Sequence, residues 1–236
     1  AGVMMRHLWI TMFSILCCLS QAAMGQDIFQ TLDPATTELE LATAGRGHGI
    51  NALGGHLFVR VINQSRNVDL VMQWGLFDLS DPDFVYSYIN GDMKFRSGVT
   101  ASDRQFEYYR QVENRSVWTV PLNLTTQQKA HLLKKFSWWM QPENRTYQYN
   151  LWYNNCATAV RDLLHEALGP KFKEHYQVPL GETFRTLGEE YFLNYPAIPY
   201  FADTFFNSSI DQPLQKWDAW LLPVMAQDLL ADVPAF

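Results

Sequence analysis

The alternation of apolar and polar positions predicts several strands in the first half of the chain. Residues 38–41 alternate glutamate with leucine, a period of two that is typical of an edge strand. Residues 56–62 and 68–74 are rich in β-branched and aromatic side chains, which favours two further strands. Residues 117–120 form another candidate, which Pro121 should end because proline cannot donate to a ladder.

A capping box predicts the first long helix. Thr125 is followed three residues later by Gln128, and the two side chains can satisfy each other's backbone N–H groups. Apolar residues then recur at helical spacing. We expect this helix to end near Met140, before Gln141 and Pro142.

A second helix is expected to begin after Asn154 or Asn155, either of which can serve as the N-cap. Its apolar positions again follow helical spacing, and Gly169 with Pro170 supplies the stop. Beyond Pro170, prolines and aromatic residues dominate. Short helices and irregular packing over the core are expected there.

The N-terminal segment has the pattern of an export signal. Arg6 precedes the apolar run 8–19, and the small residues Ala23 and Gly25 fit a signal peptidase site. We predict that residues 1–25 are a signal peptide, with an uncleaved anchor as the alternative, and that residues 26–236 form a single domain. The mature chain is expected to be soluble or peripheral to a membrane.

Composition narrows the classes of partner. Apolar residues make up 47% of the 236 residues and charged residues 18%, which excludes a disordered chain or a rod. Asp and Glu number 24 against 18 for Lys and Arg, so no nucleic-acid partner is expected. No zinc or calcium spacing occurs, and we expect neither a metal nor a cofactor.

Cys156 is the candidate nucleophile. Loss of the signal removes Cys17 and Cys18, so the mature chain would keep one cysteine and no internal disulfide. Cys156 falls in the first turn of the second predicted helix, where free N–H groups and the helix dipole favour an anion. We therefore expect a lowered thiol pKa there.

His56 is the candidate base, because it stands at the start of a predicted strand. A third polar group should orient the imidazole, and Gln73 on the adjacent strand is preferred to Asp78. The backbone N–H of Cys156 is expected to hold an oxyanion, with the Asn155 side chain as a neighbouring donor unless it only caps the helix.

Four ordered motifs resemble the Lnb N-terminal periplasmic domain family. They are GHLFVRV at 55–61, WGLFD at 74–78, PENRTYQYN at 142–150 and NCATAVRDLL at 155–164. The resemblance extends over roughly residues 40 to 230. It implies an α+β fold of circularly permuted papain-like type, related to the NlpC/P60 group, with an antiparallel sheet, packed helices and a periplasmic location. In it, His56 and Cys156 match the family's histidine and cysteine.

The family takes its name from a bacterial lipoprotein N-acyltransferase. The resemblance thus implies a thiol acyltransferase or acyl hydrolase that forms an acyl thioester on Cys156, with a lipoprotein or a lipid or peptide of the cell envelope as substrate. A thiol amidohydrolase or peptidase acting on peptidoglycan peptides is one alternative. A binding module with an inert thiol is another, and it predicts slow alkylation of Cys156 and a long separation between Cys156 and His56.

Overall fold

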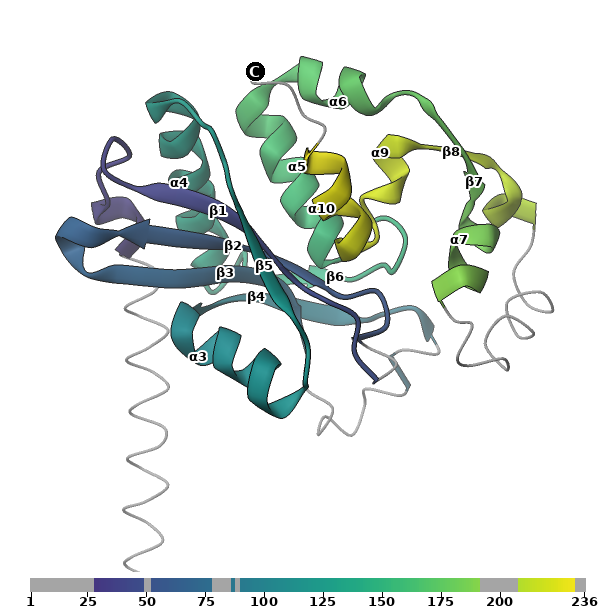
Figure 1. The fold of residues 1–236 in the computed structure, drawn as a ribbon, viewed down its shortest axis with the longest axis horizontal. Helices are drawn as coiled ribbons and strands as arrows, with labels where there is room; N and C mark the ends of the chain where they lie inside the picture. Colours follow the sequence, from purple (N-terminus) through teal and green to yellow (C-terminus); the bar gives the residue numbers. More distant parts are fainter. Residues whose placement is uncertain (1–27, 49–51, 78–85, 88–89, 192–207, 232–236) are drawn as a thin grey trace, which may run out of the picture.

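The computed structural model describes residues 28–48, 52–77, 86–87, 90–191 and 208–231. Within them, a six-stranded antiparallel sheet runs in the order β5-β1-β2-β3-β4-β6 (Figure 1). The strands are β1 (Glu38–Ala44), β2 (His56–Asn63), β3 (Val68–Leu76), β4 (Lys94–Ala101), β5 (Val117–Pro121) and β6 (Thr146–Gln148). The signal-peptide prediction for residues 1–25 lies outside the described residues.

The main core forms between one face of this sheet and two helices, α4 (Thr126–Met140) and α5 (Cys156–Leu168). Strand periodicity places Leu57, Val59 and Val61 of β2 on this face, where they join apolar side chains of both helices. Burying them removes apolar surface from water, which supplies most of the stabilisation of such a core.

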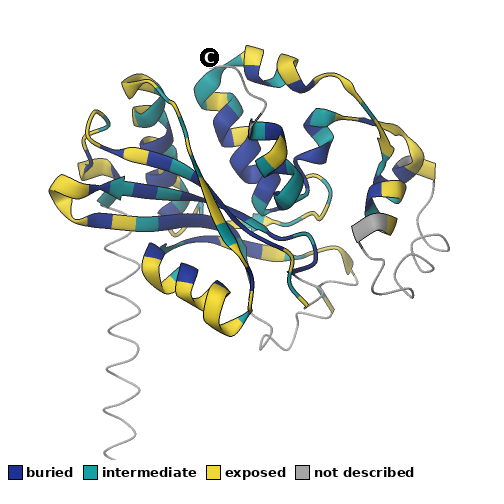
Figure 2. Cartoon of the chain, in the orientation of Figure 1, coloured by how far each residue is buried: buried dark blue, intermediate teal, exposed yellow. Residues whose placement is uncertain are grey.

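The opposite face is covered by α3 (Ser102–Glu107) and the π-helical turn η3 (Tyr108–Val112) (Figure 1). Phe58 of β2 packs there against Phe106 and Tyr109. The outer side of α3 is exposed (Figure 2). Polar residues cover that outer side, so this helix gives only a weak apolar pattern in the sequence.

The segment after residue 169 covers the core with short elements. They are α6 (Pro170–Tyr176), β7 (Pro179–Thr183), α7 (Phe184–Tyr191), η4 (Ser208–Asp211), β8 (Pro213–Gln215), α9 (Lys216–Ala219) and α10 (Pro223–Ala231). Phe172, Tyr176, Trp217 and Trp220 extend the main core. The expected short helices are therefore present, together with a two-stranded sheet of β7 and β8 that the sequence did not predict.

The prediction of a mixed fold with an antiparallel sheet and packed helices is confirmed. The interpretation of residues 38–41 as an edge strand was wrong, because β1 pairs with β2 on one side and with β5 on the other. Among the helices of the described ranges, none is both long and apolar enough to cross a bilayer.

Candidate active site

Cys156 is the first residue of α5, as the sequence predicted. The side-chain oxygen of Asn155 accepts from the N–H groups of Ala157 and Thr158, at 2.8 and 2.9 Å. The hydroxyl of Thr158 in turn accepts from the N–H of Asn155 at 2.8 Å. This closed capping box fixes where the helix begins, and hence where the thiol stands.

The other end of the Asn155 amide is also occupied. Its nitrogen donates to the carbonyl oxygens of Leu151 and Leu221, both at 2.8 Å. An amide nitrogen has two protons, so none remains for a developing oxyanion in this conformation. The observed interactions of Asn155 are thus those of a cap that also ties the loop before α5 to the chain after α9.

The thiol of Cys156 lies near the point where β2 and β3 cease to pair. The ladder between the two strands ends at the pair Phe58–Gln73, and β3 is irregular between Gln73 and Leu76. Gly75 has φ of +83°, and a Cβ built there would lie 3.5 Å from Cβ of Cys156. The start of α5 therefore packs directly against the bulge in β3.

His56 opens β2, and its side chain points to the sheet face that α3 covers. The ring stacks on Phe58 with centroids 5.5 Å apart and lies 6.3 Å from the ring of Tyr109. Helix α5 packs on the other face. The cysteine and the histidine thus approach from opposite faces, at the end of the β2–β3 ladder.

Gln73 is in contact with His56, as the sequence predicted. Its Oε1 lies 3.3 Å from Nε2 of the imidazole. Its Nε2 donates to Oγ1 of Thr100 at 3.3 Å and to Oε1 of Gln105 at 3.2 Å, which fixes the direction of the amide. The oxygen of Gln73 must therefore accept from Nε2–H of His56, so a neutral ring keeps its lone pair on Nδ1. Asp78, the second choice, lies outside the described residues.

Both groups are uncharged at neutral pH in this structure. Burial, followed by the charge of Arg115, lowers the pKa of His56 to about 4, against the hydrogen bond with Gln73 and the charge of Glu113. Burial raises the pKa of the Cys156 thiol, and the backbone N–H groups of Leu57, Ala157 and Cys156 offset this only in part. The expectation of a lowered thiol pKa was wrong, because desolvation of the sulfur outweighs the helix terminus.

Leu57 connects the two candidate residues. It directly follows His56, and its backbone N–H favours the thiolate form of Cys156. Among the described residues, no hydrogen bond joins the imidazole to the sulfur. The strand that carries the histidine is therefore in contact with the thiol, while the ring itself is held by Gln73.

Tyr147 of β6 is a further residue near Cys156, to which the sequence analysis assigned no catalytic role. Its hydroxyl is screened from solvent and makes no hydrogen bond of good geometry among the described residues, although the N–H of Gly75 lies close to it. Burial and the nearby Cys156 raise the pKa of Tyr147, and the N–H of Gly75 acts in the opposite direction. No sequence signal distinguishes it from the other aromatic residues around positions 147–153.

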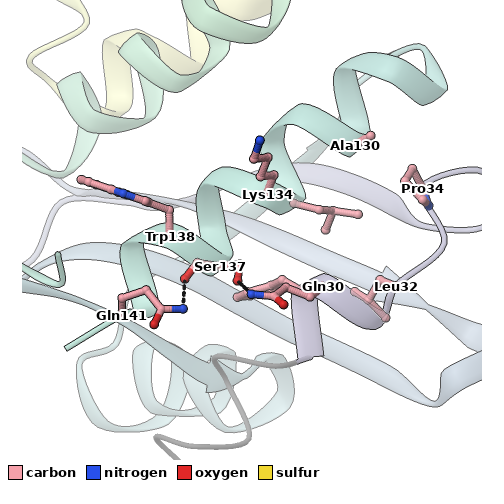
Figure 3. Close-up of a pocket in the computed structure, with 10 residues that line it drawn as sticks. Gln30, Leu32, Pro34, Ala130, Lys134, Ser137, Trp138 and Gln141 are labelled. Atoms are coloured by element: carbon pink, nitrogen blue, oxygen red, sulfur yellow. Dashed lines mark hydrogen bonds between the residues drawn. The ribbon is translucent and has the colours of Figure 1, made fainter. Parts of the chain in front are cut away.

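A hollow of about 560 Å³ lies away from these residues, between residues 29–34 and α4 (Figure 3). Gln30 donates to the hydroxyl of Ser137 across it at 2.7 Å. Its lining includes neither Cys156 nor His56. It therefore does not form part of the candidate site.

The fold and the site define a class: a mixed α/β domain with one thiol at a helix start beside a histidine strand. The chain belongs to the Lnb N-terminal periplasmic domain family, whose sequence profile matches residues 26–190. The protein is accordingly periplasmic. No curated protein and no solved structure matches the chain.

Proposed function

We propose that this protein is a cysteine-dependent acyl-transfer enzyme of the cell envelope. The observation that carries the proposal is the position of Cys156 at the start of α5, against Gly75 and the N–H of Leu57. These two residues belong to the strands that hold His56 and Gln73. Nucleophile, base and orienting group are thereby drawn from adjoining positions of three elements.

The protonation states favour general-base catalysis over a preformed ion pair. Neutral His56 takes the thiol proton on Nδ1 while Sγ of Cys156 attacks the carbonyl carbon of an ester or amide. The C–O or C–N bond then breaks, and His56 returns the proton to the leaving group. An amine or water attacks the thioester in the second step, which releases the acyl group and restores the thiol.

Two donors remain for the oxyanion once Asn155 is assigned to capping. One is the backbone N–H of Cys156, and the other is the hydroxyl of Tyr147, whose pKa the nearby Cys156 helps to raise. A buried hydroxyl without a well-formed hydrogen bond costs stability, so a role in the reaction would account for its retention.

The family supports an acyl donor from a lipid and an acceptor amine on a lipoprotein. Peptides of the cell wall are the alternative substrate class for the same residues. Two probes distinguish these substrate classes. A diacylglyceryl-cysteine peptide with phospholipid vesicles tests the first, and a cell-wall tetrapeptide tests the second.

A second candidate function, a binding module with an inert thiol, also has support. The raised thiol pKa and the lack of a hydrogen bond between the ring and the sulfur both fit it. Slow alkylation at neutral pH is expected under either function, because the thiol is neutral in both. Alkylation therefore does not discriminate, and formation of a thioester does.

The test uses the full chain with Cys17→Ser and Cys18→Ser, so that Cys156 is the sole thiol. Incubation with a p-nitrophenyl acyl ester should add one acyl group to the intact protein, lost on treatment with hydroxylamine. His56→Gln should slow this acylation by about 10²-fold or more, the usual contribution of a general base. His131→Gln, on the surface of α4, is the matched control and should react like the parent.

Equal acyl adducts in the parent and in a Cys156→Ala variant would rule out thiol catalysis. No adduct from any ester, lipid or peptide probe would leave the binding module as the function.

A further inference from the structure

Arg115 is a buried cation to which the reaction proposed above gives no role, although its charge also favours the thiolate form of Cys156. Arg115 is only 6% exposed to solvent. Its Nε donates to the carbonyl of Gly45 at 2.6 Å, Nη2 to the carbonyl of Ala44 at 3.3 Å, and Nη1 to Glu113 at 2.5 Å. Each of the three guanidinium nitrogens thus makes a hydrogen bond, which fixes the position of the charge.

The local backbone explains how an arginine enters this position. Asn114 has φ of +50°, a left-handed conformation that ends η3 and reverses the chain. The N–H of Arg115 then donates to the carbonyl of Tyr109 at 2.9 Å. The chain continues into β5, which pairs with β1 beside Ala44.

In this position Arg115 contacts Tyr109, which in turn lies beside the His56 ring. The guanidinium lies over the ring of Tyr109, with Cζ 4.8 Å from its centroid. Tyr109 in turn faces both His56 and Phe58. Ala44, whose carbonyl Arg115 holds, is the partner of His56 in the β1–β2 register.

We propose that Arg115 is a positioning residue for His56: it clamps Tyr109 and the end of β1 against the imidazole and keeps a positive charge beside it, so that the ring acts as a neutral base. The inference rests on the proposed function in assigning His56 that task.

The charged and titratable groups around His56 determine in which direction its pKa should shift when each of them is removed. Arg115 disfavours protonation of the ring and Glu113 favours it, while Gln73 contributes its hydrogen bond. Tyr109 has its pKa raised, first by burial, and Cys156 is also a thiol of raised pKa, so both are neutral near pH 7. Removal of Arg115 and removal of Glu113 should therefore shift the pKa of His56 in opposite directions.

The experiment follows the imidazole resonances of the full chain by NMR between pH 3 and 8, with a His56→Gln spectrum to assign the signal. Arg115→Met should raise the pKa of His56 by about one unit, the shift expected when a close like charge is removed. Glu113→Gln should lower it further. Arg110→Met, an exposed arginine of the same turn, is the control and should leave it unchanged.

Acylation of Cys156 is measured in parallel. With a raised pKa, Arg115→Met should lose acylation rate below about pH 6 while Arg110→Met does not. Arg115→Lys keeps the charge but not the fork of hydrogen bonds, so it should hold the pKa near that of the parent and still slow the reaction.

An unchanged His56 pKa in a folded Arg115→Met variant overturns the proposal. If that variant does not fold, Glu113→Gln decides, because a constant or raised pKa there is equally contrary. Titration needs no turnover, so the expected shifts without any acylation would overturn the proposed function and not the electrostatic role of Arg115.

Discussion

Tyr176 is a buried tyrosine of the main core and Tyr147 is a partly buried one packed against it, and their hydroxyl groups differ. The hydroxyl of Tyr176 donates to the carbonyl of Leu229 at 3.1 Å. That of Tyr147 makes no hydrogen bond of good geometry among the described residues, although the N–H of Gly75 lies close to it. An unsatisfied buried hydroxyl destabilises a fold, whereas a satisfied one contributes about 1 kcal/mol.

Replacement of each by phenylalanine should therefore have opposite effects on stability. Tyr147→Phe should leave the free energy of unfolding unchanged or raise it, and Tyr176→Phe should lower it by about 1 kcal/mol. Urea unfolding monitored by circular dichroism measures both. If Tyr147→Phe proves the more destabilising of the two, the hydroxyl of Tyr147 forms a hydrogen bond in solution, for which the N–H of Gly75 is a nearby donor.

The contact of a site residue could be predicted from the sequence where its partner lies on the neighbouring strand. The contact between His56 and Gln73 follows from two adjacent strands that are readily identified. Arg115 was not predictable, because its partners Ala44 and Gly45 lie about 70 positions earlier and no local pattern links them. The thiol pKa was mispredicted because helix position is local information, whereas burial depends on the whole core.

At the scale of elements, the capping boxes of α4 and α5 differ in burial. Thr125 caps α4 at the surface, with Thr125 and Gln128 bonded at 3.3 and 2.8 Å. Asn155 caps α5 in the interior and also donates to two carbonyls. Loss of the buried cap therefore removes more interactions and leaves more groups unpaired.

Thr125→Ala should cost about 1 kcal/mol of unfolding free energy, the usual value for a cap. Asn155→Ala should cost about 3 kcal/mol, since the carbonyls of Leu151 and Leu221 lose their donor as well. Chemical denaturation of both variants tests the difference. Equal costs would mean that water replaces the buried partners of Asn155.

Helices with local start signals were predicted accurately, as were the strands β2, β3 and β5, whereas the place of β1 in the sheet and the presence of β4 were not. Both α4 and α5 begin within one residue of the predicted position. β1 was taken for an edge strand because its second neighbour, β5, follows about 75 residues later. β4 was missed, since its sequence KFRSGVTA has no strict alternation and contains Gly98.

The free energy of unfolding of the whole molecule should decrease in acid because of His56. Its pKa in the folded protein is about 4, below the ordinary 6.5, so the unfolded chain binds more protons between these two values. Stability is therefore fully present above about pH 6.5 and is lost as the pH falls toward 4. A shift of this size corresponds to about 3 kcal/mol.

The free energy of unfolding from urea titrations at pH 7 and pH 4.5 should show this loss. A His56→Gln variant, which cannot titrate there, should lose much less over the same interval. Identical pH dependence of the two proteins would mean that the imidazole is more accessible to protons than its surroundings indicate. Asp69, whose pKa is lowered first by its hydrogen bond with Arg60, adds its contribution at lower pH.

The π-helical turn η3 (Tyr108–Val112) should leave a recognisable pattern in the sequences of related proteins. Its N–H of Glu113 reaches the carbonyl of Tyr108, five residues back, so the turn holds one residue more than a regular helix would. One residue corresponds to about 100° of rotation around a helix axis. A homologue without that insertion would present another side chain to the imidazole, and an alignment of the family should show the gap and a change at the position of Tyr109 together.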